Sequence, residues 1–265
     1  MSVYDKEKPD YLYRSIQSIW DDQCLKPNQI VLVKDGPLTN KLNKTIHYWK
    51  ERLGDVLTLI PLEKNLGLGD ALNIGLSNCA YNLVARMDAD DIAYPERFKD
   101  QINYMHENKN CDIVGSYVTE FNSDPDSIVS FRKVFCSHEE IVKHAKIKNP
   151  FNHPSVLYKK SAVVDAGGYK KFDGFEDYYL WVRMIISGAR CSNIAAPLVN
   201  MRTGYSMLSR RGGFRYAMNE IKLQYKFFEL EFISIFQFLK NLIIRIPIRL
   251  LPNKIRELVY RIMRD

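Results

Sequence analysis

The sequence of 265 residues is poor in several features, and each shortage narrows the classes of protein to consider. It contains no uncharged apolar run of about 18 residues, so we expect no conventional transmembrane helix. Its first residues lack the basic and then apolar regions of a secretory signal. Five scattered cysteines without a C-x-x-C pair fit reduced thiols better than a disulfide framework or a zinc site. The 13 glycines and 11 prolines are too few for a collagen-like or low-complexity chain. We therefore expect a cytoplasmic protein that is either soluble or peripheral to a membrane.

The composition that remains is that of a globular chain with an excess of basic residues. Hydrophobic residues make up 46% and charged residues 26%, and the net charge is +7. Residues 241–265 contain six Lys or Arg against two Asp or Glu, a net charge of +4. A basic segment of this kind suits nucleic acid or an anionic membrane. Because its basic residues are interleaved with Leu, Ile and Val rather than Gly or Ser, we expect a membrane surface and no nucleic-acid partner.

Short apolar runs and helical patterns alternate over about the first two hundred residues. This alternation is typical of βαβ units, and it predicts an α/β fold with a mostly parallel central sheet and flanking helices. From residue 214 the pattern is helical, with breaks expected at Pro247 and Pro252. Strands are expected at residues 30–33, 56–61, 83–87, 112–116 and 155–158. Helices are expected to begin at Pro9 and at Pro95. Further helices are expected over 38–52, from the loop at 65–69 to about 78, from 137 to about 148, and over 178–187.

Three carboxylates crowd four positions directly after the expected strand at residues 83–87. Asp88, Asp90 and Asp91 would repel one another without a compensating cation. The carboxyl ends of strands in open α/β sheets are where ligands bind. Hard divalent cations such as Mg²⁺ and Mn²⁺ take carboxylate oxygens and substrate phosphates as ligands. The motif therefore indicates a metal-assisted phosphate site, with a solvated acidic loop that caps the next helix as the alternative.

Other polar residues lie at the ends of expected elements, and each has a structural alternative. Asp35 follows an apolar strand and could accept hydrogen bonds from a nucleobase imide or a ribose, although Asp-Gly-Pro is also a common turn. The loop at residues 65–69 could let its backbone approach a phosphate, or it could cap a helix. Glu176 and Asp177 lie among aromatic residues that could raise a carboxyl pKa toward the range of a general base. Acids in a first helical turn also complement the helix dipole.

Six segments, taken together and in order, carry a resemblance to a known family. They are Met-Ser-Val-Tyr at 1–4, Val-Leu-Val-Lys-Asp-Gly at 31–36, Asn-Leu-Gly-Leu-Gly at 65–69, Ala-Arg-Met-Asp-Ala-Asp-Asp at 85–91, Pro-Glu-Arg-Phe at 95–98 and Gly-Phe-Glu-Asp-Tyr-Tyr-Leu-Trp at 174–181. The set resembles the inverting nucleotide-sugar glycosyltransferases of family 2, which have the GT-A fold, over about residues 1–205. With residues 149–153 and 210–213, it resembles the branch that builds bacterial O-antigen, capsule and exopolysaccharide repeat units, such as the amylovoran-type transferases.

The resemblance implies how the nucleotide of a UDP-sugar donor would be held. Ser2 and Tyr4 would line the nucleobase pocket, and Asp35 would hold the uracil ring. Asn65 and Gly67, in the glycine-containing loop, would also contact the donor.

A metal site at the donor diphosphate is implied in the same way. Asp88 would contact the ribose or the metal, and Ala89 would contact the donor. Asp90 would coordinate Mn²⁺ or Mg²⁺ bridging the diphosphate. Such an ion would neutralise the departing nucleoside diphosphate.

On the acceptor side, the resemblance implies that Asp177 is the general base that deprotonates the acceptor hydroxyl, with Glu176 beside it. Inversion needs one such base in line with the anomeric carbon. His153 is by itself more typical of a structural loop histidine. The residues that the resemblance places near the acceptor are His153, Trp181, Arg210 and Arg211.

The chain is expected to divide into a catalytic domain and a C-terminal segment. Residues 1–210 would form the GT-A domain, with a nucleotide-binding half at about 1–115 and an acceptor half at about 116–210. Residues 211–265 would form a helical, basic amphipathic segment that places the protein on the inner face of the cytoplasmic membrane. Packing of this segment on the catalytic domain, or on a second subunit of a homodimer, stays open.

The first strand is expected to be unusual. Family members normally carry several β-branched residues before the Ser-Val-Tyr segment, whereas here the strand is a stub of about four residues. We expect either a start upstream of Met1 or a truncated chain with a damaged nucleotide pocket. A central parallel strand is buried on both faces, so its loss should be costly.

The function expected from the resemblance is transfer of a hexose from UDP-glucose or UDP-galactose to a lipid-pyrophosphate-linked sugar. Two alternatives remain at this point. One is a non-catalytic or truncated membrane-surface protein that binds nucleotide sugars. The other is a sugar-phosphate nucleotidylyltransferase, which would need a glycine-rich loop with Arg and Lys near the first strand.

Overall fold

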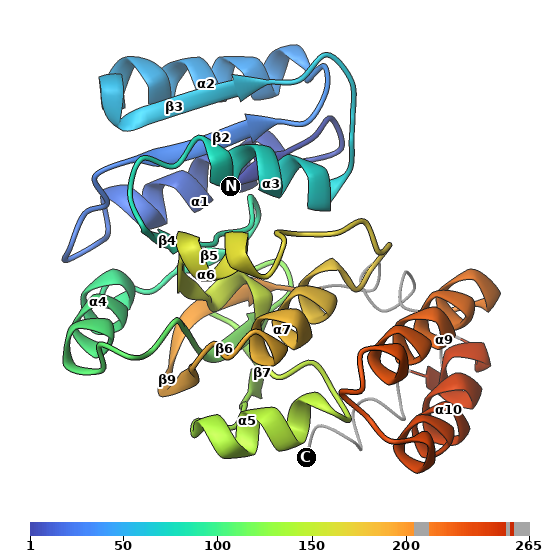
Figure 1. Ribbon diagram of the computed structural model, residues 1–265. Coiled ribbons are helices and arrows are strands. Elements are labelled where there is room, and N and C mark those ends of the chain that lie inside the picture. The colour runs from blue at the N-terminus through green and yellow to red at the C-terminus, as the bar shows by residue number, and fades with distance from the viewer. Residues whose placement is uncertain (204–211, 253–254, 257–265) are drawn as a thin grey trace.

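The computed structural model describes residues 1–203, 212–252, 255 and 256. An N-terminal sheet is built from β1 (Ser2–Val3), β2 (Ile30–Lys34) and β3 (Leu57–Pro61), in the order β1-β2-β3 with both pairings parallel (Figure 1). The strand β2 is buried along four consecutive apolar residues. A continuous apolar run of this kind is typical of a parallel strand covered on both faces.

The helices of the N-terminal part are α1 (Pro9–Trp20), α2 (Asn40–Leu53) and α3 (Leu68–Ser77), with a short 3-10 turn at Gly54–Val56. Pro9 occupies the first turn of α1, where a missing backbone N–H costs nothing. The apolar positions Leu12 and Ile16 face the core and pack with Trp49 of α2. The expected α1 and the strand at 30–33 are therefore confirmed.

A second sheet lies at the centre of the molecule, and it is mixed. Its strands are β4 (Leu83–Ala85), β5 (Ile92–Ala93), β6 (Ile113–Phe121), β7 (Ile128–Arg132), β8 (Leu157–Lys159) and β9 (Cys191–Arg202). The order is β4-β8-β6-β9-β5, and β7 pairs with the other part of β6. Of these pairings, β6–β9 is parallel and the rest are antiparallel.

The expectation of a mostly parallel sheet thus holds for the N-terminal sheet and is wrong for the second one. The short connection from β6 to β7 forces an antiparallel hairpin, because parallel neighbours need a long crossover. Strands β5, β7 and β9 were not expected from the sequence. In β9 several polar residues and Pro197 interrupt the apolar pattern, and the pairing register shifts near Pro197.

Helices flank the second sheet much as expected. Ser137 caps α5 by accepting a hydrogen bond from the backbone N–H of Glu140, as its capping-box pattern predicts. The helices and 3-10 turn of this part are α4 (Arg97–Glu107), α5 (His138–Ala145), the turn at His153–Ser155, α6 (Lys160–Asp165) and α7 (Glu176–Ile186).

The C-terminal helices α9 (Phe214–Glu229) and α10 (Ile235–Leu250) lie side by side at the edge of the molecule (Figure 1). A shared cluster in which Tyr178 of α7 packs on Phe227 of α9 joins them to the rest. Pro247 does not break α10, which corrects the expectation. The carbonyl left without a partner by Pro247 belongs to the strongly exposed Ile243, so water can bind it. No described helix is long and apolar enough to cross a bilayer.

Candidate active site

The acidic residues 88–91 follow β4 and are held by two arginines. The Asp88 carboxylate forms an ion pair with the buried Arg86, and its backbone carbonyl accepts a hydrogen bond from Ser15 Oγ at 2.8 Å. Asp91 is only 3% exposed, and its Oδ1 accepts from the backbone N–H of Arg202 at 2.7 Å. The loop is therefore fixed from both sides rather than solvated, and the alternative of a merely solvated acidic loop loses its support.

Arg202 is a residue that the sequence analysis missed. It lies at the end of β9, and its Nε donates to the backbone carbonyl of Asp90 at 3.1 Å. Its guanidinium lies over the rings of Tyr11 and Phe121, 3.6 and 4.4 Å from their centroids. It thereby joins α1, β6, β9 and the acidic loop. No local motif marks this arginine, because its partners are 80 or more positions away in the sequence.

Burial and mutual repulsion of the acids outweigh the nearby arginines in the electrostatics of the loop. Burial, together with the charges of Asp88 and Glu7, raises the pKa of Asp90 to about 7. Burial and its two acidic neighbours raise the pKa of Asp91 well above its ordinary value. Like-charged carboxylates of this kind are stabilised by a nearby cation.

The chemistry of this donor set fits a divalent metal that is shared with a substrate. The described residues contain no cluster of three or more His, Cys, Asp or Glu that could enclose an ion. Mg²⁺ and similar ions commonly use one or two carboxylates and take their other ligands from phosphates and water. Asp88 and Asp90 would supply the carboxylates of that kind of site, whereas Asp91 accepts from the backbone N–H of Arg202.

Asp35 and the loop at 65–69 form one structural unit. The two oxygens of the buried Asp35 carboxylate accept from the backbone N–H groups of Leu66, at 2.7 Å, and Gly67, at 3.2 Å. A side chain at Gly36 would place its Cβ 2.7 Å from the Asn65 nitrogen, so only glycine allows the loop to approach. Asp35 therefore positions the loop that begins α3, and this structural role was not expected.

Glu176 and Asp177 lie in the first turn of α7, as predicted. Asp177 Oδ2 accepts from Asn149 Nδ2 and its Oδ1 accepts from the backbone N–H of Tyr178, both at 2.7 Å. Glu176 Oε2 accepts from the backbone N–H of Gly174 at 3.0 Å. Burial raises the pKa of Glu176 to about 7. Both carboxylates are half-buried and are held by neutral donors.

Contacts connect these carboxylates to the glycine-containing loop. A Cβ built on Gly69 would lie 3.4 Å from Cγ of Glu176. The loop at 65–69 therefore contacts the carboxylate of Asp35 and also lies beside the first turn of α7, which is more than 100 positions further along the chain. This arrangement agrees with a single site lined by both groups.

Several residues that were expected near substrates have other surroundings. Trp181 is 1% exposed and packs on Phe151 in the core, which corrects its placement at the acceptor. His153 packs on the same tryptophan, and its Nε2 lies 3.1 Å from the Tyr169 hydroxyl. Burial and the charge of Arg86 keep the pKa of His153 well below its ordinary value. The structural interpretation of His153 is therefore favoured.

The remaining predicted residues differ in the solvent exposure of their side chains. Ser2 lies in β1 and Tyr4 follows it with 36% of its surface exposed. The Ala89 side chain belongs to the N-terminal core, so only its backbone is available to a donor. Arg210 and Arg211 lie outside the described residues.

Comparisons with known proteins agree with this geometry. A family model for glycosyl transferase family 2 matches residues 1–167. The chain belongs to this family. It is therefore a glycosyltransferase and not a nucleotidylyltransferase, and the non-catalytic alternative also loses its support.

Two curated relatives are similar over almost the whole chain. The UDP-Gal:alpha-D-GlcNAc-diphosphoundecaprenol beta-1,3-galactosyltransferase of Escherichia coli is 39% identical over 98% of this chain and 94% of its own length. The amylovoran biosynthesis glycosyltransferase AmsE of Erwinia amylovora is 38% identical over 98% of this chain and 96% of its own length. The branch to which the motifs pointed is thus confirmed by these relatives.

A solved structure confirms the GT-A fold of the chain. The mannosyltransferase PcManGT from Pyrobaculum calidifontis, in complex with GDP-Man and Mn²⁺, superposes with a TM-score of 0.64 at 15% sequence identity. The alignment covers 86% of this chain and 63% of the mannosyltransferase. At this identity the likeness concerns the fold alone.

Proposed function

We propose that this glycosyltransferase moves a hexose from a UDP-sugar to a sugar on a lipid pyrophosphate, in the synthesis of O-antigen, capsule or exopolysaccharide. UDP-galactose and UDP-glucose are the candidate donors. The proposal is supported by the presence of both an acidic loop after β4 and a carboxylate pair in the first turn of α7, in a chain 39% identical to an E. coli galactosyltransferase of this type. The galactosyltransferase makes UDP-galactose the first donor to test.

Asp88 and Asp90 are proposed to hold Mn²⁺ or Mg²⁺ at the donor diphosphate. When bound, such an ion neutralises the charge that develops on the departing nucleoside diphosphate. Arg202 fixes the backbone on which Asp90 sits, and Arg86 fixes the Asp88 side chain. The residues proposed to contact the donor are Ser2, Tyr4, Asp35, Asn65, Gly67 and the backbone of Ala89.

Asp177 is proposed as the general base, with Glu176 as its neighbour. Each Asp177 oxygen accepts one hydrogen bond within the protein, so each has a further lone pair for the proton of an acceptor hydroxyl. Asn149 holds the carboxylate in one orientation. A base that is fixed in this way removes the acceptor proton as the hydroxyl oxygen attacks the anomeric carbon, which gives inversion.

The reaction is tested by incubating the protein and Mn²⁺ with a panel of labelled UDP-sugars and a synthetic GlcNAc-diphosphate lipid. We expect transfer from UDP-galactose or UDP-glucose to the lipid, with inverted configuration in the product by NMR. Absence of transfer from every UDP-sugar, with transfer from a GDP- or dTDP-sugar, would contradict the donor assignment. Transfer to a sugar that carries no lipid pyrophosphate, at an equal rate, would contradict the acceptor assignment.

Residues 211–265 are proposed to place the catalytic domain, residues 1–210, on the inner face of the cytoplasmic membrane. In this segment Phe232 is buried against α7 and α9, whereas Phe236 and Ile243 of α10 are 81% and 73% exposed. Leu239 lies between them and is also exposed. This exposed row is of the kind that an interfacial helix buries at the headgroup boundary.

The basic residues of α10 act differently from the expectation. Arg245 and Arg249 do not face outward, because both form ion pairs with Glu220, whose side chain is fully buried. Among the basic residues of α10, Lys240 is exposed. Within the described residues, apolar insertion of Phe236 and Ile243 is therefore expected to contribute more to membrane binding than charge.

Liposome flotation tests this placement. We expect the full chain to float with anionic vesicles and the double variant Phe236→Ser, Ile243→Ser to remain at the bottom with transfer to a short, soluble acceptor retained. A control is Val164→Ser on α6, which also removes an exposed apolar side chain and should float normally. Equal flotation of the double variant and the control would show that α10 is not the membrane contact.

A further inference from the structure

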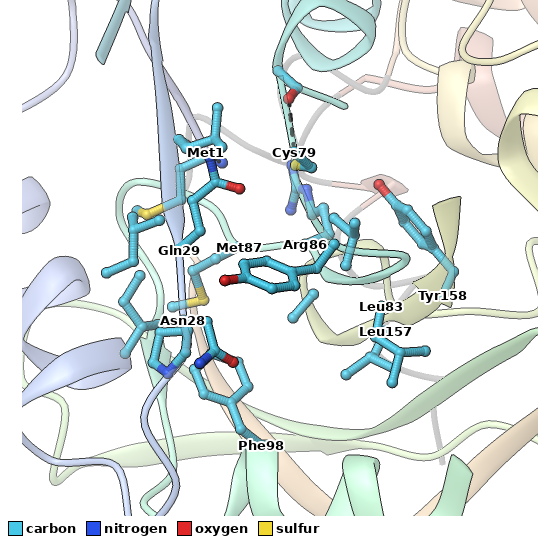
Figure 2. Close-up of a pocket in the computed structure, with 18 of the residues that line it drawn as sticks. Met1, Asn28, Gln29, Cys79, Leu83, Arg86, Met87, Phe98, Leu157 and Tyr158 are labelled. Atoms are coloured by element: carbon cyan, nitrogen blue, oxygen red, sulfur yellow. Dashed lines mark hydrogen bonds between the residues drawn. The ribbon is translucent and has the colours of Figure 1, made fainter. Parts of the chain in front are cut away.

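A cavity of about 480 Å³ lies between the two sheets, with Met1 and Gln29 on one side of it and Leu83, Leu157 and Tyr158 on the other (Figure 2). Among the residues that the structure describes, its lining includes none of the carboxylates of the proposed site. The volume is typical of small-molecule pockets in general and identifies no occupant. The contacts that hold the proposed general base lead in another direction, to the C-terminal helices.

Two donors of α10 cap the end of α5. Asn241 Nδ2 donates to the backbone carbonyl of Lys146 at 2.8 Å, and Arg245 Nη1 donates to that of Ile147. Asn241 and Arg245 are four positions apart, so they lie on the same face of α10. The last carbonyls of a helix have no partner within it, and these donors therefore satisfy groups that α5 itself leaves open. The chain is thus fixed by α10 at the point where α5 ends.

The orientation of Arg245 is set by a buried carboxylate. Glu220 of α9 is fully buried, and its Oε1 pairs with both Nε and Nη2 of Arg245, while its Oε2 pairs with a second arginine. Because a guanidinium is planar, pairing along the Nε–Nη2 edge leaves Nη1 directed toward the end of α5. Asn241 is held in a similar way, since its Nδ2 also donates to Oε1 of the buried Gln224 at 2.8 Å. Both donors of α10 are therefore placed by α9.

The segment that follows this cap holds the proposed base. Asn149 comes two residues after Ile147, and its Nδ2 donates to Oδ2 of Asp177 at 2.7 Å. The next residue of α7, Tyr178, donates from its hydroxyl to the Ala145 carbonyl, also at 2.7 Å. The end of α5 and the first turn of α7 are thus joined by two hydrogen bonds, one on each side of the carbonyls that α10 caps. A displacement of about 1 Å at this end of α5 is enough to break the bond between Asn149 and Asp177.

We propose that Asn241 and Arg245 are positioning residues of the transferase, which hold the end of α5 so that Asn149 keeps Asp177 in its reactive orientation. This role rests on the proposed function of Asp177 as the general base. Both residues lie on α10 at the edge of the molecule, and they act on the reaction through Asn149 (Figure 1). The C-terminal helices therefore help to form the catalytic site, in addition to any contact with a membrane.

The variants Asn241→Leu and Arg245→Met test the proposal separately in the full chain. Asn241→Leu keeps a branched side chain of similar size and leaves the ion pairs of Glu220 intact, so it covers the case in which Arg245→Met does not fold. We expect each variant to lower kcat about tenfold, the effect of about one lost hydrogen bond, with KM for the UDP-sugar unchanged. Either variant combined with Asn149→Ala should be no slower than Asn149→Ala alone, because all three act through the same contact.

Arg249→Met is the matched control for Arg245→Met. The Arg249 guanidinium pairs with the other oxygen of Glu220 and lies over the Tyr216 ring. Both variants thus leave the same buried carboxylate with one arginine fewer. We expect Tm to fall by a similar amount in the two variants, and kcat of Arg249→Met, measured well below its Tm, to stay close to that of the wild type.

The side-chain amide signal of Asn149 provides a readout that does not depend on activity. In protein labelled with ¹⁵N-asparagine, this NMR signal is assigned by its absence in Asn149→Ala. A hydrogen bond to a carboxylate shifts the amide proton downfield. We therefore expect the signal to move upfield in Asn241→Leu and Arg245→Met and to stay in place in Arg249→Met.

Wild-type kcat in both α10 variants would overturn the proposal, and so would a fall in kcat without a shift of the Asn149 signal. Equal losses of kcat in Arg245→Met and Arg249→Met would also overturn it, because they would reflect the stability of the helix pair. Wild-type kcat in Asp177→Asn would overturn the general base and the proposal with it. That failure is distinguished from the others by an Asn149 signal that still shifts in the α10 variants.

Discussion

The two carboxylate groups of the site are held in different ways. Asp88 is paired with the Arg86 guanidinium, Asp91 accepts from the backbone N–H of Arg202, and Asp90 is crowded by other acids. Asp177 is bound by the neutral amide of Asn149 and by a backbone N–H. A loop of crowded acids gains from binding a cation, whereas a carboxylate held by neutral donors stays free to take a proton. The comparison supports the proposal that the acidic loop binds a cation and that Asp177 performs acid–base chemistry.

The largest effect is expected from Asp90→Ala, which removes the carboxylate proposed to coordinate the metal. We expect transfer to be abolished because the metal at the diphosphate loses a protein ligand. Without metal, Tm should stay equal or rise, because a buried carboxylate that is crowded by other acids has been removed. Initial rates with Mn²⁺ and with EDTA, and a thermal melt, measure both. Near-normal turnover of the variant in EDTA would contradict the metal assignment.

Asp177→Asn should cost about 10²–10⁴-fold in kcat, the usual range for loss of one positioned base. The substitution keeps the shape and removes the basicity, so binding of the UDP-sugar should be unchanged. Calorimetric titration with UDP and Mn²⁺ measures that binding. Wild-type kcat, or loss of UDP binding, would show that Asp177 is not the base.

A smaller effect is expected from Asn149→Ala, which removes a hydrogen bond to the base without touching the reacting atoms. Loss of a hydrogen bond to a charged group corresponds to roughly 10–100-fold in rate. The fall should appear in kcat, with KM for the UDP-sugar unchanged and Tm close to that of the wild type. The double variant with Asp177→Asn should be no slower than Asp177→Asn alone, because Asn149 acts through that carboxylate. Additive losses in the double variant would show a separate role.

The smallest effect is expected in the pH dependence of stability, through the carboxyl group of Glu176. Because burial raises its pKa from 4.5 to about 7, the folded state keeps a proton that the unfolded chain has lost between these values. Stability from this group is therefore full below about pH 4.5 and is lost as the pH rises to about 7. Glu176→Gln should lack this loss, so its Tm relative to the wild type should rise between pH 5 and 7 and then level off. Glu63→Gln, at an exposed position, should show no such trend.

Local signals in the sequence were sufficient for much of the N-terminal part and for the carboxylates. The apolar run of β2, the spacing of α1 and the acids after β4 all depend on contacts between near neighbours in the chain. The family resemblance then assigned Asp90 and Asp177 their proposed roles. These are features that a short window of sequence can carry, because period and residue type act locally.

Only the tertiary structure decided which distant groups meet. Arg202 reaches Asp90 and Asp91 from a strand with a mixed pattern, and Asn149 reaches Asp177 from a loop. Trp181 was expected near the acceptor and the basic C-terminal segment on a membrane surface, yet Trp181 fills the core and Arg245 of that segment pairs with the buried Glu220. Sequence alone determines that a residue is aromatic or charged, but burial and pairing depend on elements that the chain brings together from far apart.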